Sequence, residues 1–434
     1  MKSANPLPAK LSRYVDHPDD VRGDLWTSRY DGAKVGVGPR VRSIVSDLLA
    51  WNEETSLTPV HYIVLHELMD SGFLIPADIE ETERSFPIER QLRKSIPLFG
   101  AKWATVTQTF NEDCWVVFGV PSDLGSTTSG AANGPKLLRQ ASKRHAWRAG
   151  SFKDAFTVEG AEHPTLAMEI HDLGDLMLPR ANIDDCLLSV EQIVRSLSHN
   201  AIPLMLGGDH CFTYAVVREL SSTRRRPIHL VQFDHHLDVD FYGPFSESGP
   251  RNLKPLNHSN FISHIKAVDP DIKITQIGVD HYQCAEVGSS AHMRRHLSEV
   301  GRQFSNLQLL SLKNEEIIAE IDEAADLYIS FDVDVIDASQ MSSTGNPAYF
   351  GVEYGRILSI VRDLARSRNV IGLDIMEFGV PDQFMSLGVQ READKVTLLM
   401  AEAISGTGHY RLNRAGLIQA KFDLHGVTNG RLDP

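Results

Sequence analysis

The sequence contains little cysteine, because only four cysteines occur in 434 residues, and none of them form a Cys-x-x-Cys pair. This spacing argues against a zinc ribbon and against a disulfide framework. The sequence also lacks any run of about 18 apolar residues, the length that a transmembrane helix needs. No apolar segment of the signal-peptide type occurs near its N-terminus. We therefore expect a cytoplasmic protein.

The sequence also has fewer positively charged than negatively charged residues. The chain has 43 lysines and arginines against 57 aspartates and glutamates, which gives a formal net charge of -14. This balance disfavours nucleic acid or an anionic membrane as the main partner. With 42% hydrophobic residues, the chain is long enough to bury a large core and to carry an additional segment.

Aspartates are concentrated in two segments that follow apolar, strand-forming runs. One segment reads Asp234-His-His-Leu-Asp238, and the other reads Asp332-Val-Asp334. Residues two apart on an extended strand point the same way, so Asp234, His236 and Asp238 share one side, and Asp332 and Asp334 share another. Burying so many carboxylates together without cations would cost more free energy than folding can supply.

Metal ions are the cations that this pattern indicates. His210, which ends an upstream Gly-Gly-Asp-His string, and His236 add two imidazoles to the four aspartates. Four carboxylates balance two divalent ions and leave room for one hydroxide. Such a set suits Mn²⁺, with Ni²⁺, Fe²⁺ and Co²⁺ as alternatives, whereas the absence of cysteine disfavours structural zinc. A strand edge followed by a solvated turn would explain either aspartate string alone, but not all three segments in this order.

From about residue 112 onward, short β-rich runs alternate with helical patterns, which is typical of a parallel sheet in an α/β fold. Helices are expected at 183–198, behind Asn182 as N-cap, and at 391–405, closed by Gly406. In open α/β sheets, ligands bind at the carboxyl ends of the strands, where the aspartates and His210 lie. The eight expected strands are 114–120, 166–171, 202–206, 228–233, 272–278, 307–311, 326–332 and 369–375.

Residues 1–111 have a different pattern, and we expect them to form a helical N-terminal extension ahead of a catalytic domain at 112–434. The expected helices are 39–51 and 59–71, the second with Thr58 as N-cap. Their apolar faces must be buried, so the extension is expected to pack on the core or on a neighbouring subunit. A lid over the substrate pocket is the alternative.

Several further motifs make the chain resemble the ureohydrolase family, which includes the arginases, agmatinases, guanidinobutyrases and formimidoylglutamases. The resemblance implies a three-layer α/β sandwich around an eight-stranded, mainly parallel sheet, with a binuclear manganese site. The matching motifs include FGVPSDLGS at 118–126, LGGDHC at 206–211, FDHHLD at 233–238, SFDVDVID at 330–337 and GLDIMEF at 372–378.

The resemblance also implies roles for individual residues. Glu377 would receive the guanidinium group of the substrate, and two ions sharing a water would lower the pKa of that water towards neutrality. Asp334 and His258 are candidates to protonate the leaving nitrogen, with His264 as an alternative to His258. One ion would be held by His210, Asp234, Asp238 and Asp332, and the other by Asp234, His236, Asp332 and Asp334.

Two departures from the family pattern bear on the substrate. Asp240 stands where arginases carry asparagine and formimidoylglutamases carry arginine, and Asp280 replaces the arginine of the QIGxR motif. Two acids near the pocket mouth would favour a cationic or carboxylate-free compound, such as an agmatine-like compound, guanidine, a substituted guanidine or a biguanide. The alternative is that both acids point to solvent or into unrelated hydrogen bonds.

Other functions stay open beside this one. The chain can be a guanidinobutyrase or an arginase, a formimidoyl or amidine hydrolase, or a non-catalytic subunit, since a fold does not define a reaction. The resemblance further implies a homo-oligomer, a trimer or hexamer, or a hetero-oligomer with a homologous subunit.

Overall fold

The computed structural model describes residues 9–11, 15–16, 25–28, 34–50, 57–70, 73–76, 88–111, 113–145, 168–178, 182–239, 253–289, 291–381 and 386–414. The chain divides into two compact units, Met1–Arg93 and Lys94–Pro434. This division falls earlier than the boundary expected after residue 111. Residues 94–111 lie in the larger unit, where Leu98 and Phe99 join the main hydrophobic core.

The smaller unit combines two helices with short strands. The helices predicted at 39–51 and 59–71 are present as α1 and α2. Ile44 and Leu48 of α1 share a small core with Leu65 of α2. How this unit packs on other parts stays a prediction. Its elements are β1 (Ala9–Leu11), β2 (Val15–Asp16), β3 (Leu25–Ser28), β4 (Lys34–Gly36), α1 (Pro39–Leu49), α2 (Pro59–Asp70) and β5 (Leu74–Pro76), whereas the two-residue strand β6 (Leu92–Arg93) is an edge strand of the central sheet, beside β9.

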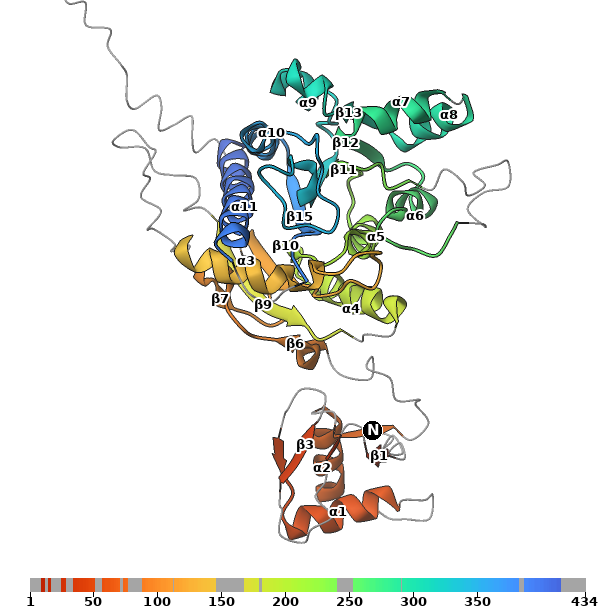
Figure 1. The fold of residues 1–434 in the computed structure, drawn as a ribbon. Coiled ribbons are helices and arrows are strands. Elements are labelled where there is room, and N and C mark those ends of the chain that lie inside the picture. Colours follow the sequence, from red (N-terminus) through yellow and green to blue (C-terminus); the bar gives the residue numbers. More distant parts are fainter. Residues whose placement is uncertain are drawn as a thin grey trace, which may run out of the picture. The chain divides into compact units, whose positions relative to one another are not determined.

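A parallel sheet forms the centre of the larger unit, as predicted (Figure 1). Its inner strands are buried at every position, as in β10 and β11, because helices cover both faces of the sheet. In spatial order the eight main strands are β13 (Arg302–Ser305), β12 (Lys273–Val279), β11 (Ile228–Phe233), β14 (Asp326–Asp332), β15 (Val370–Met376), β10 (Ala201–Leu206), β8 (Cys114–Gly119) and β9 (Glu169–Leu176). A short strand, β7 (Lys102–Trp103), pairs with β9.

Seven of the eight predicted strands are present, and one was misplaced. The strand expected at 307–311 is instead β13 at Arg302–Ser305, and the next turn of 3₁₀-helix covers Gln308–Leu310. Edge strand β13 has the sequence RQFS, which lacks a continuous apolar run, so the apolar residues after it gave a false signal.

Helices cover both faces of the sheet, which confirms the three-layer sandwich. In Figure 1, α3, α10 and α11 pack together on one face, and α4, α5 and α6 lie on the other. The helices are α3 (Gly134–Ser142), α4 (Ile183–Ser196), α5 (Thr213–Thr223), α6 (Phe261–Val268), α7 (His281–Ser289), α8 (Ala291–Val300), α9 (Asn314–Ile318), α10 (Tyr354–Ser367) and α11 (Leu387–Arg414).

Two helix predictions had different outcomes. Asn182 caps α4, because its side chain accepts a hydrogen bond from the backbone N–H of Asp184. Gly406 does not end α11, which continues to Arg414. A Cβ atom at Gly406 would lie 2.7 Å from the Cβ of Ala365 in α10. The glycine therefore permits close packing of two helices, which the sequence alone did not distinguish from a helix stop.

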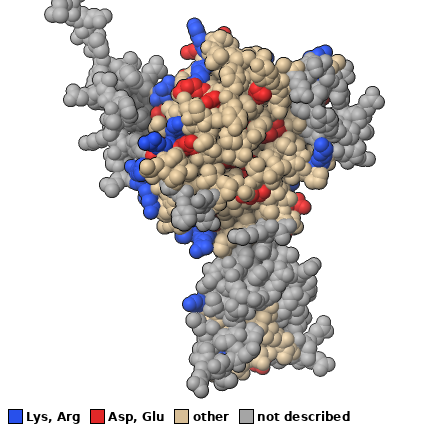
Figure 2. Space-filling model, in the orientation of Figure 1, with Lys and Arg blue, Asp and Glu red and all other residues tan. Residues whose placement is uncertain are grey.

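On the face that Figure 2 shows, the described residues form no broad patch of one sign. In Figure 2, lysines and arginines stand mainly around the margin of the larger unit, and acidic side chains are scattered over it. Over the described residues, no helix combines the length and the apolar character that crossing a membrane requires.

Candidate active site

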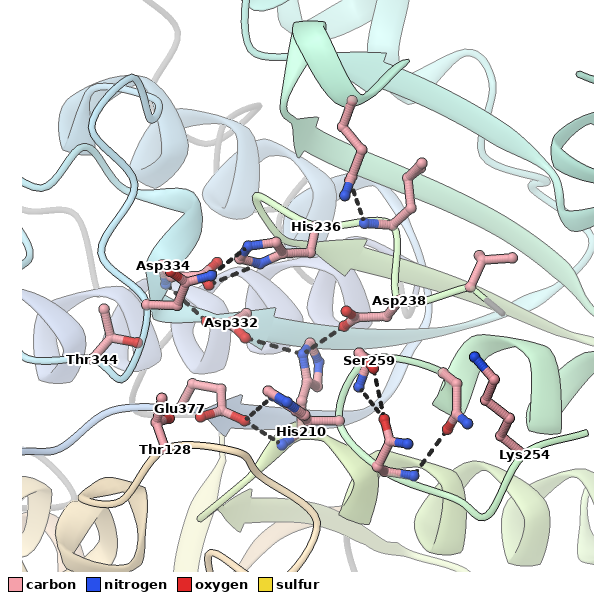
Figure 3. Close-up of a pocket in the computed structure, with 17 residues that line it drawn as sticks. Thr128, His210, His236, Asp238, Lys254, Ser259, Asp332, Asp334, Thr344 and Glu377 are labelled. Carbon is pink, nitrogen blue, oxygen red and sulfur yellow. Dashed lines mark hydrogen bonds and ion pairs between the residues drawn. The ribbon is translucent and has the colours of Figure 1, made fainter. Parts of the chain in front are cut away.

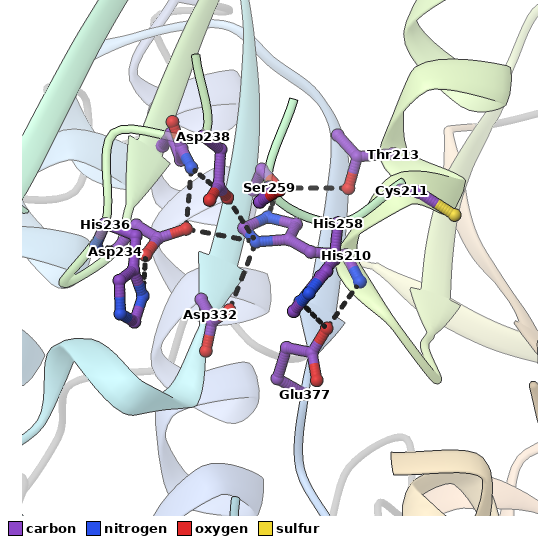
Figure 4. A network of polar contacts seen from close by, with 12 residues as sticks. His210, Cys211, Thr213, Asp234, His236, Asp238, His258, Ser259, Asp332 and Glu377 are labelled. Carbon is purple, nitrogen blue, oxygen red and sulfur yellow. Dashed lines mark hydrogen bonds and ion pairs between the residues drawn. The ribbon is translucent and has the colours of Figure 1, made fainter. Parts of the chain in front are cut away.

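The candidate site lies at the carboxyl ends of the central strands. His210 follows β10, Asp234 follows β11 and Asp332 ends β14. Strands β11 and β14 are hydrogen-bonded neighbours, so their aspartates emerge side by side. Figure 4 shows Asp234, Asp238 and Asp332 converging around the imidazole of His210. The fold thus brings together residues that are distant in the sequence.

His210 stands at the centre of the first group of ligating atoms. Its Nδ1 atom lies 3.1 Å from Asp234 Oδ2, 3.2 Å from Asp332 Oδ2 and 3.5 Å from Asp238 Oδ2. This buried nitrogen has no hydrogen-bond partner among the described residues. On the other side of the ring, Nε2 lies 2.8 Å from the hydroxyl of Ser330, which fixes the orientation of the imidazole.

His236 stands at the centre of a second group. Its Nδ1 atom lies 3.0 Å from Asp334 Oδ2 and 3.4 Å from Asp234 Oδ1. Asp234 therefore turns one carboxylate oxygen towards each histidine. Two sets of three residues meet the distance requirement for holding an ion, namely His210, Asp234 and Asp332, and Asp234, His236 and Asp334. They share Asp234. Asp332, which the resemblance also assigned to both ions, belongs only to the first set, and Asp238 belongs to neither.

The electrostatics of this cluster require positive charge. Burial, followed by the Asp234 carboxylate, raises the pKa of Asp238 well above its usual range. Burial, followed by Asp334 and Asp234, does the same to the pKa of Asp332. Burial also acts on Asp234, but the neighbouring imidazoles of His210 and His236 outweigh it and lower the pKa of Asp234. The ionised cluster is thus unfavourable by itself, and divalent cations would relieve the repulsion.

These residues fit a pair of divalent cations. The cluster offers carboxylate oxygens and two imidazole nitrogens, and the unsatisfied Nδ1 of His210 points to a position that a cation would occupy. This donor set contains no thiolate and matches the preference of Mn²⁺ better than that of structural zinc.

Glu377 lies beside the cluster, just past the end of β15. Its backbone has a φ of 59°, in the left-handed region, and its N–H donates to the carbonyl of Gly208 at 2.9 Å. Its Oε1 atom accepts a hydrogen bond of 2.9 Å from the backbone N–H of His210. A left-handed conformation is unusual for glutamate, and these contacts hold the side chain towards the cluster.

The structure distinguishes the two histidines that the sequence left as alternatives. His258 Nδ1 lies 3.6 Å from Glu377 Oε1, and the backbone N–H of His258 donates to Gly125. His264 instead contacts the carbonyl of Lys254 through Nε2, at 3.0 Å, and does not line the pocket. Only His258 of this pair is placed to exchange a proton with the candidate site.

A pocket of about 360 Å³ opens onto the cluster. Figure 3 shows Lys254 and Ser259 on one wall and Thr128 and Thr344 on the other, with His210 between them. The sequence analysis assigned no role to these wall residues. The TGNP string at 344–347, a further match to the ureohydrolase family, was one signal, because the amide nitrogen of its Asn346 lies 2.8 Å from His236 Nε2. No comparable signal marked Lys254.

The two acids expected at the pocket mouth are not both found there. Asp280 is absent from the described lining of the pocket, and its carboxylate accepts from the backbone N–H groups of Tyr282 and Gln283 at the start of α7. The expected contact of Asp280 with substrate is therefore corrected, since the carboxylate caps a helix. Asp240 lies outside the described residues.

Comparisons with known proteins agree with this geometry. The model of the Arginase family matches residues 114–383. An agmatinase from Pyrococcus horikoshii is 30% identical over 273 residues, which cover 61% of this chain and 83% of that protein. A guanidinopropionase from Pseudomonas aeruginosa is 26% identical over 280 residues, covering 61% and 79%. The solved structure of proclavaminate amidino hydrolase from Streptomyces clavuligerus has the same fold, with a TM-score of 0.57 and 20% identity over 74% of this chain and 99% of that chain.

Proposed function

Because the chain belongs to the arginase family, we propose that it is a binuclear metal-dependent hydrolase that cleaves a guanidinium C–N bond and releases urea. One observation carries this proposal. Two potential metal-binding groups share Asp234 and open into the same pocket as Glu377. A nucleophile and a guanidinium-binding carboxylate would thus face each other across one cavity.

The proposed ligands are the same residues that the sequence indicated. One ion would be held by His210, Asp234, Asp238 and Asp332, and the other by Asp234, His236, Asp332 and Asp334. Mn²⁺ suits this donor set best, with Ni²⁺ as the alternative. When bound, the two ions would supply Lewis acidity and an activated water.

Glu377 would bind and orient the guanidinium group. A planar guanidinium offers paired N–H donors, which match a carboxylate in geometry and charge. The hydrogen bond from the His210 backbone fixes Oε1, so the carboxylate is held before substrate arrives. Preorganisation of this kind lowers the cost of aligning substrate with the nucleophile.

His258 would hold the proton that the leaving nitrogen needs. Its position 3.6 Å from Glu377 Oε1 and on the pocket wall supports this role. Asp334, at the opposite side of the cluster, is the alternative proton carrier. Proton transfer in either case allows the carbon–nitrogen bond to break without releasing an unstable amide anion.

The tail of the substrate has two candidate charges. The preference for a cationic or carboxylate-free compound now rests on Asp240 alone, because Asp280 caps α7. Lys254 favours the opposite candidate, a guanidino acid such as guanidinobutyrate, because it is the one lysine or arginine in the described lining of the pocket. Its ammonium group would attract a carboxylate at the far end of a substrate whose guanidinium contacts Glu377.

The remaining expectations stay proposals. They are a cytoplasmic location and a homo-oligomeric assembly, or a hetero-oligomer with a homologous subunit. A formimidoyl or amidine hydrolase is the catalytic alternative, and a non-catalytic subunit is the other alternative. Retention of the complete proposed ligand set together with Glu377 supports catalysis over the last of these.

Product analysis tests the proposed function. The full chain, loaded in parallel with Mn²⁺ or Ni²⁺, would be incubated with agmatine, guanidine, a biguanide, guanidinobutyrate, arginine and formimidoylglutamate. We expect urea and the matching amine from at least one guanidino compound. Formamide or ammonia without urea would contradict the proposal in favour of an amidine hydrolase.

A further inference from the structure

Three glutamines form a ladder across the sheet beneath the candidate metal site. Gln232 of β11 is the register partner of Gln276 in β12, and Gln276 is the register partner of Gln303 in β13. Gln232 and Gln276 are fully buried, in strands whose other positions are mostly apolar. Buried amides without hydrogen-bond partners would destabilise the fold, so each amide of this ladder needs partners inside the protein.

The ladder ends on two of the proposed metal ligands. The amide nitrogen of Gln232 donates to Asp234 Oδ2 at 2.6 Å and to Asp238 Oδ2 at 3.2 Å. Both of its N–H groups are therefore directed at carboxylates. The reverse orientation of the amide would place Oε1 against the same two anions, so the carboxylates and the amide fix each other.

Gln276 keeps Gln232 in this orientation. Its amide nitrogen donates to Gln232 Oε1 at 2.7 Å and to the carbonyl of Leu237, also at 2.7 Å. Behind it, the amide nitrogen of Gln303 lies 3.3 Å from Gln276 Oε1. Every amide in the ladder thus donates in the same direction, from the edge strand towards the aspartates.

The contact with Leu237 connects Gln276 to the backbone of a proposed ligand. Asp238 follows Leu237 and has a φ of 50°, in the left-handed region that aspartate adopts only at a cost. The hydrogen bond to the Leu237 carbonyl holds the peptide group immediately before this residue. Gln276 therefore acts on Asp238 twice, through the backbone and through Gln232.

We propose that Gln276 is a positioning residue that sets the geometry of Asp234 and Asp238 for metal binding, although it touches neither. This inference rests on the proposed function, because it takes both aspartates as ligands. Replacing Gln276 with an apolar residue would leave Gln232 Oε1 and the Leu237 carbonyl without this donor. Gln232 would then be held by the two carboxylates alone, and the peptide group before Asp238 would lose its hydrogen bond from Gln276.

Mn²⁺ binding to the metal-stripped full chain, measured by calorimetry, tests this proposal. Gln276→Met removes the donor at similar volume, and Gln276→Glu preserves the shape but not the amide N–H groups. Partners of metal ligands typically contribute 10–100-fold to affinity, so we expect both variants to bind one of the two ions about 10-fold or more weakly. Affinities of both ions within twofold of wild type would overturn the proposal.

Thr275→Val is the matched control on the same strand. Thr275 is buried next to Gln276, but its hydroxyl contacts His229 Nε2 at 2.9 Å, away from the metal site. We expect this variant to lower the unfolding temperature and to keep wild-type Mn²⁺ affinity. Equal loss of affinity in Thr275→Val would show that general damage to β12 is sufficient, and would also overturn the proposal.

A second variant decides the matter if the Gln276 variants do not fold. Gln303→Met removes the donor to Gln276 from the partly exposed edge strand, so we expect a smaller loss, about threefold, for the same ion. Unchanged Mn²⁺ affinity in Gln303→Met would contradict the proposal that the glutamine ladder positions the two aspartates. Wild-type protein that binds two ions but releases no urea would refute the proposed function and leave the effect of Gln276 on metal affinity intact.

Discussion

The pocket has an inner end, formed by the aspartates and histidines of the candidate metal site, and an outer wall, formed by Lys254 and Ser259, and the two differ in how their residues are held. At the inner end, buried carboxylates lie at or just past strand ends, and each accepts a hydrogen bond from the Gln232 amide or from a backbone N–H. On the outer wall, Lys254 and Ser259 belong to an exposed segment outside the sheet. We infer that the inner end determines the reaction and that the outer wall determines the substrate, because only the latter can vary without disturbing the sheet.

Loss of Asp234 should have the largest effect on metal binding and activity at the inner end. Asp234→Ala removes the carboxylate that both histidines face, so we expect neither ion to bind tightly and activity to fall below about 1% of wild type. Metal analysis after dialysis, together with urea assays, would check this result. Two tightly bound ions in the variant would contradict the assignment of Asp234 to both.

Glu377→Gln should separate substrate binding from metal binding. Removing one partner of a buried charge pair costs about 2–5 kcal/mol, so we expect kcat/KM to fall by about 30-fold or more. Both ions should remain bound, because Glu377 is not among the proposed ligands. Steady-state kinetics with metal analysis measures both effects, and an unchanged kcat/KM would remove Glu377 from the account.

Removal of metal should destabilise the inner end without any mutation. A ligand present at 100 times its dissociation constant stabilises the folded state by about 2.7 kcal/mol, so chelation should lower the unfolding temperature measurably. The cause is the return of repulsion among Asp234, Asp238 and Asp332. Asp234→Ala serves as the control, since its unfolding temperature should not respond to Mn²⁺. A wild-type unfolding temperature that also does not respond to Mn²⁺ would argue against the proposed metal site.

Lys254→Gln tests whether the outer wall selects substrate charge. The exposed position limits the effect to about 1 kcal/mol, so we expect KM for a guanidino acid to rise about fivefold and KM for agmatine not to rise. The opposing variant, Asp240→Asn, should raise KM for a diamine-like substrate if Asp240 reads a cation. Steady-state kinetics with a guanidino acid and with agmatine would show whether the pocket prefers a negative or a positive substrate tail. KM values for both substrates that are the same in Lys254→Gln and in wild type would exclude a role for this lysine.

Asp280→Ala should have the smallest effect on function. The loss of a helix cap costs about 1 kcal/mol, so thermal unfolding should detect a modest decrease in stability. KM should stay within twofold for every substrate, because Asp280 does not line the described pocket. A large change in KM would restore the role that the sequence first assigned to Asp280.

The residues of the inner end could be predicted from sequence because they follow the apolar strands of a parallel sheet, but the prediction from strand periodicity was wrong. β11 ends at Phe233, Asp238 has a φ of 50° and Asp334 lies in a 3₁₀ turn, so these side chains do not stand on extended strands. Asp234, His236 and Asp238 lie near His210 nonetheless, because the carboxyl ends of neighbouring parallel strands meet at one edge of the sheet. The orientation of Glu377 was not accessible in this way, since it depends on a left-handed backbone and on a contact with His210, far away in the sequence.

The outer wall and the sheet edge were less accessible for physical reasons. Asp280 had the right residue type to bind a cation, but nothing in the sequence distinguishes such an acid from a helix cap. Lys254 lies in a segment without periodicity, so its direction could not be derived. The ladder from Gln303 to Gln232 was equally hidden, because it depends on the register of three separate strands.

A titration of the metal-free chain with Mn²⁺, followed by simultaneous measurement of bound ions and urea production, tests the central claim most directly. We predict that two ions bind per chain and that urea release from a guanidino substrate reaches its maximum only when both are present. Urea production that does not depend on bound metal, or two bound ions without urea from any guanidino compound, would contradict the account.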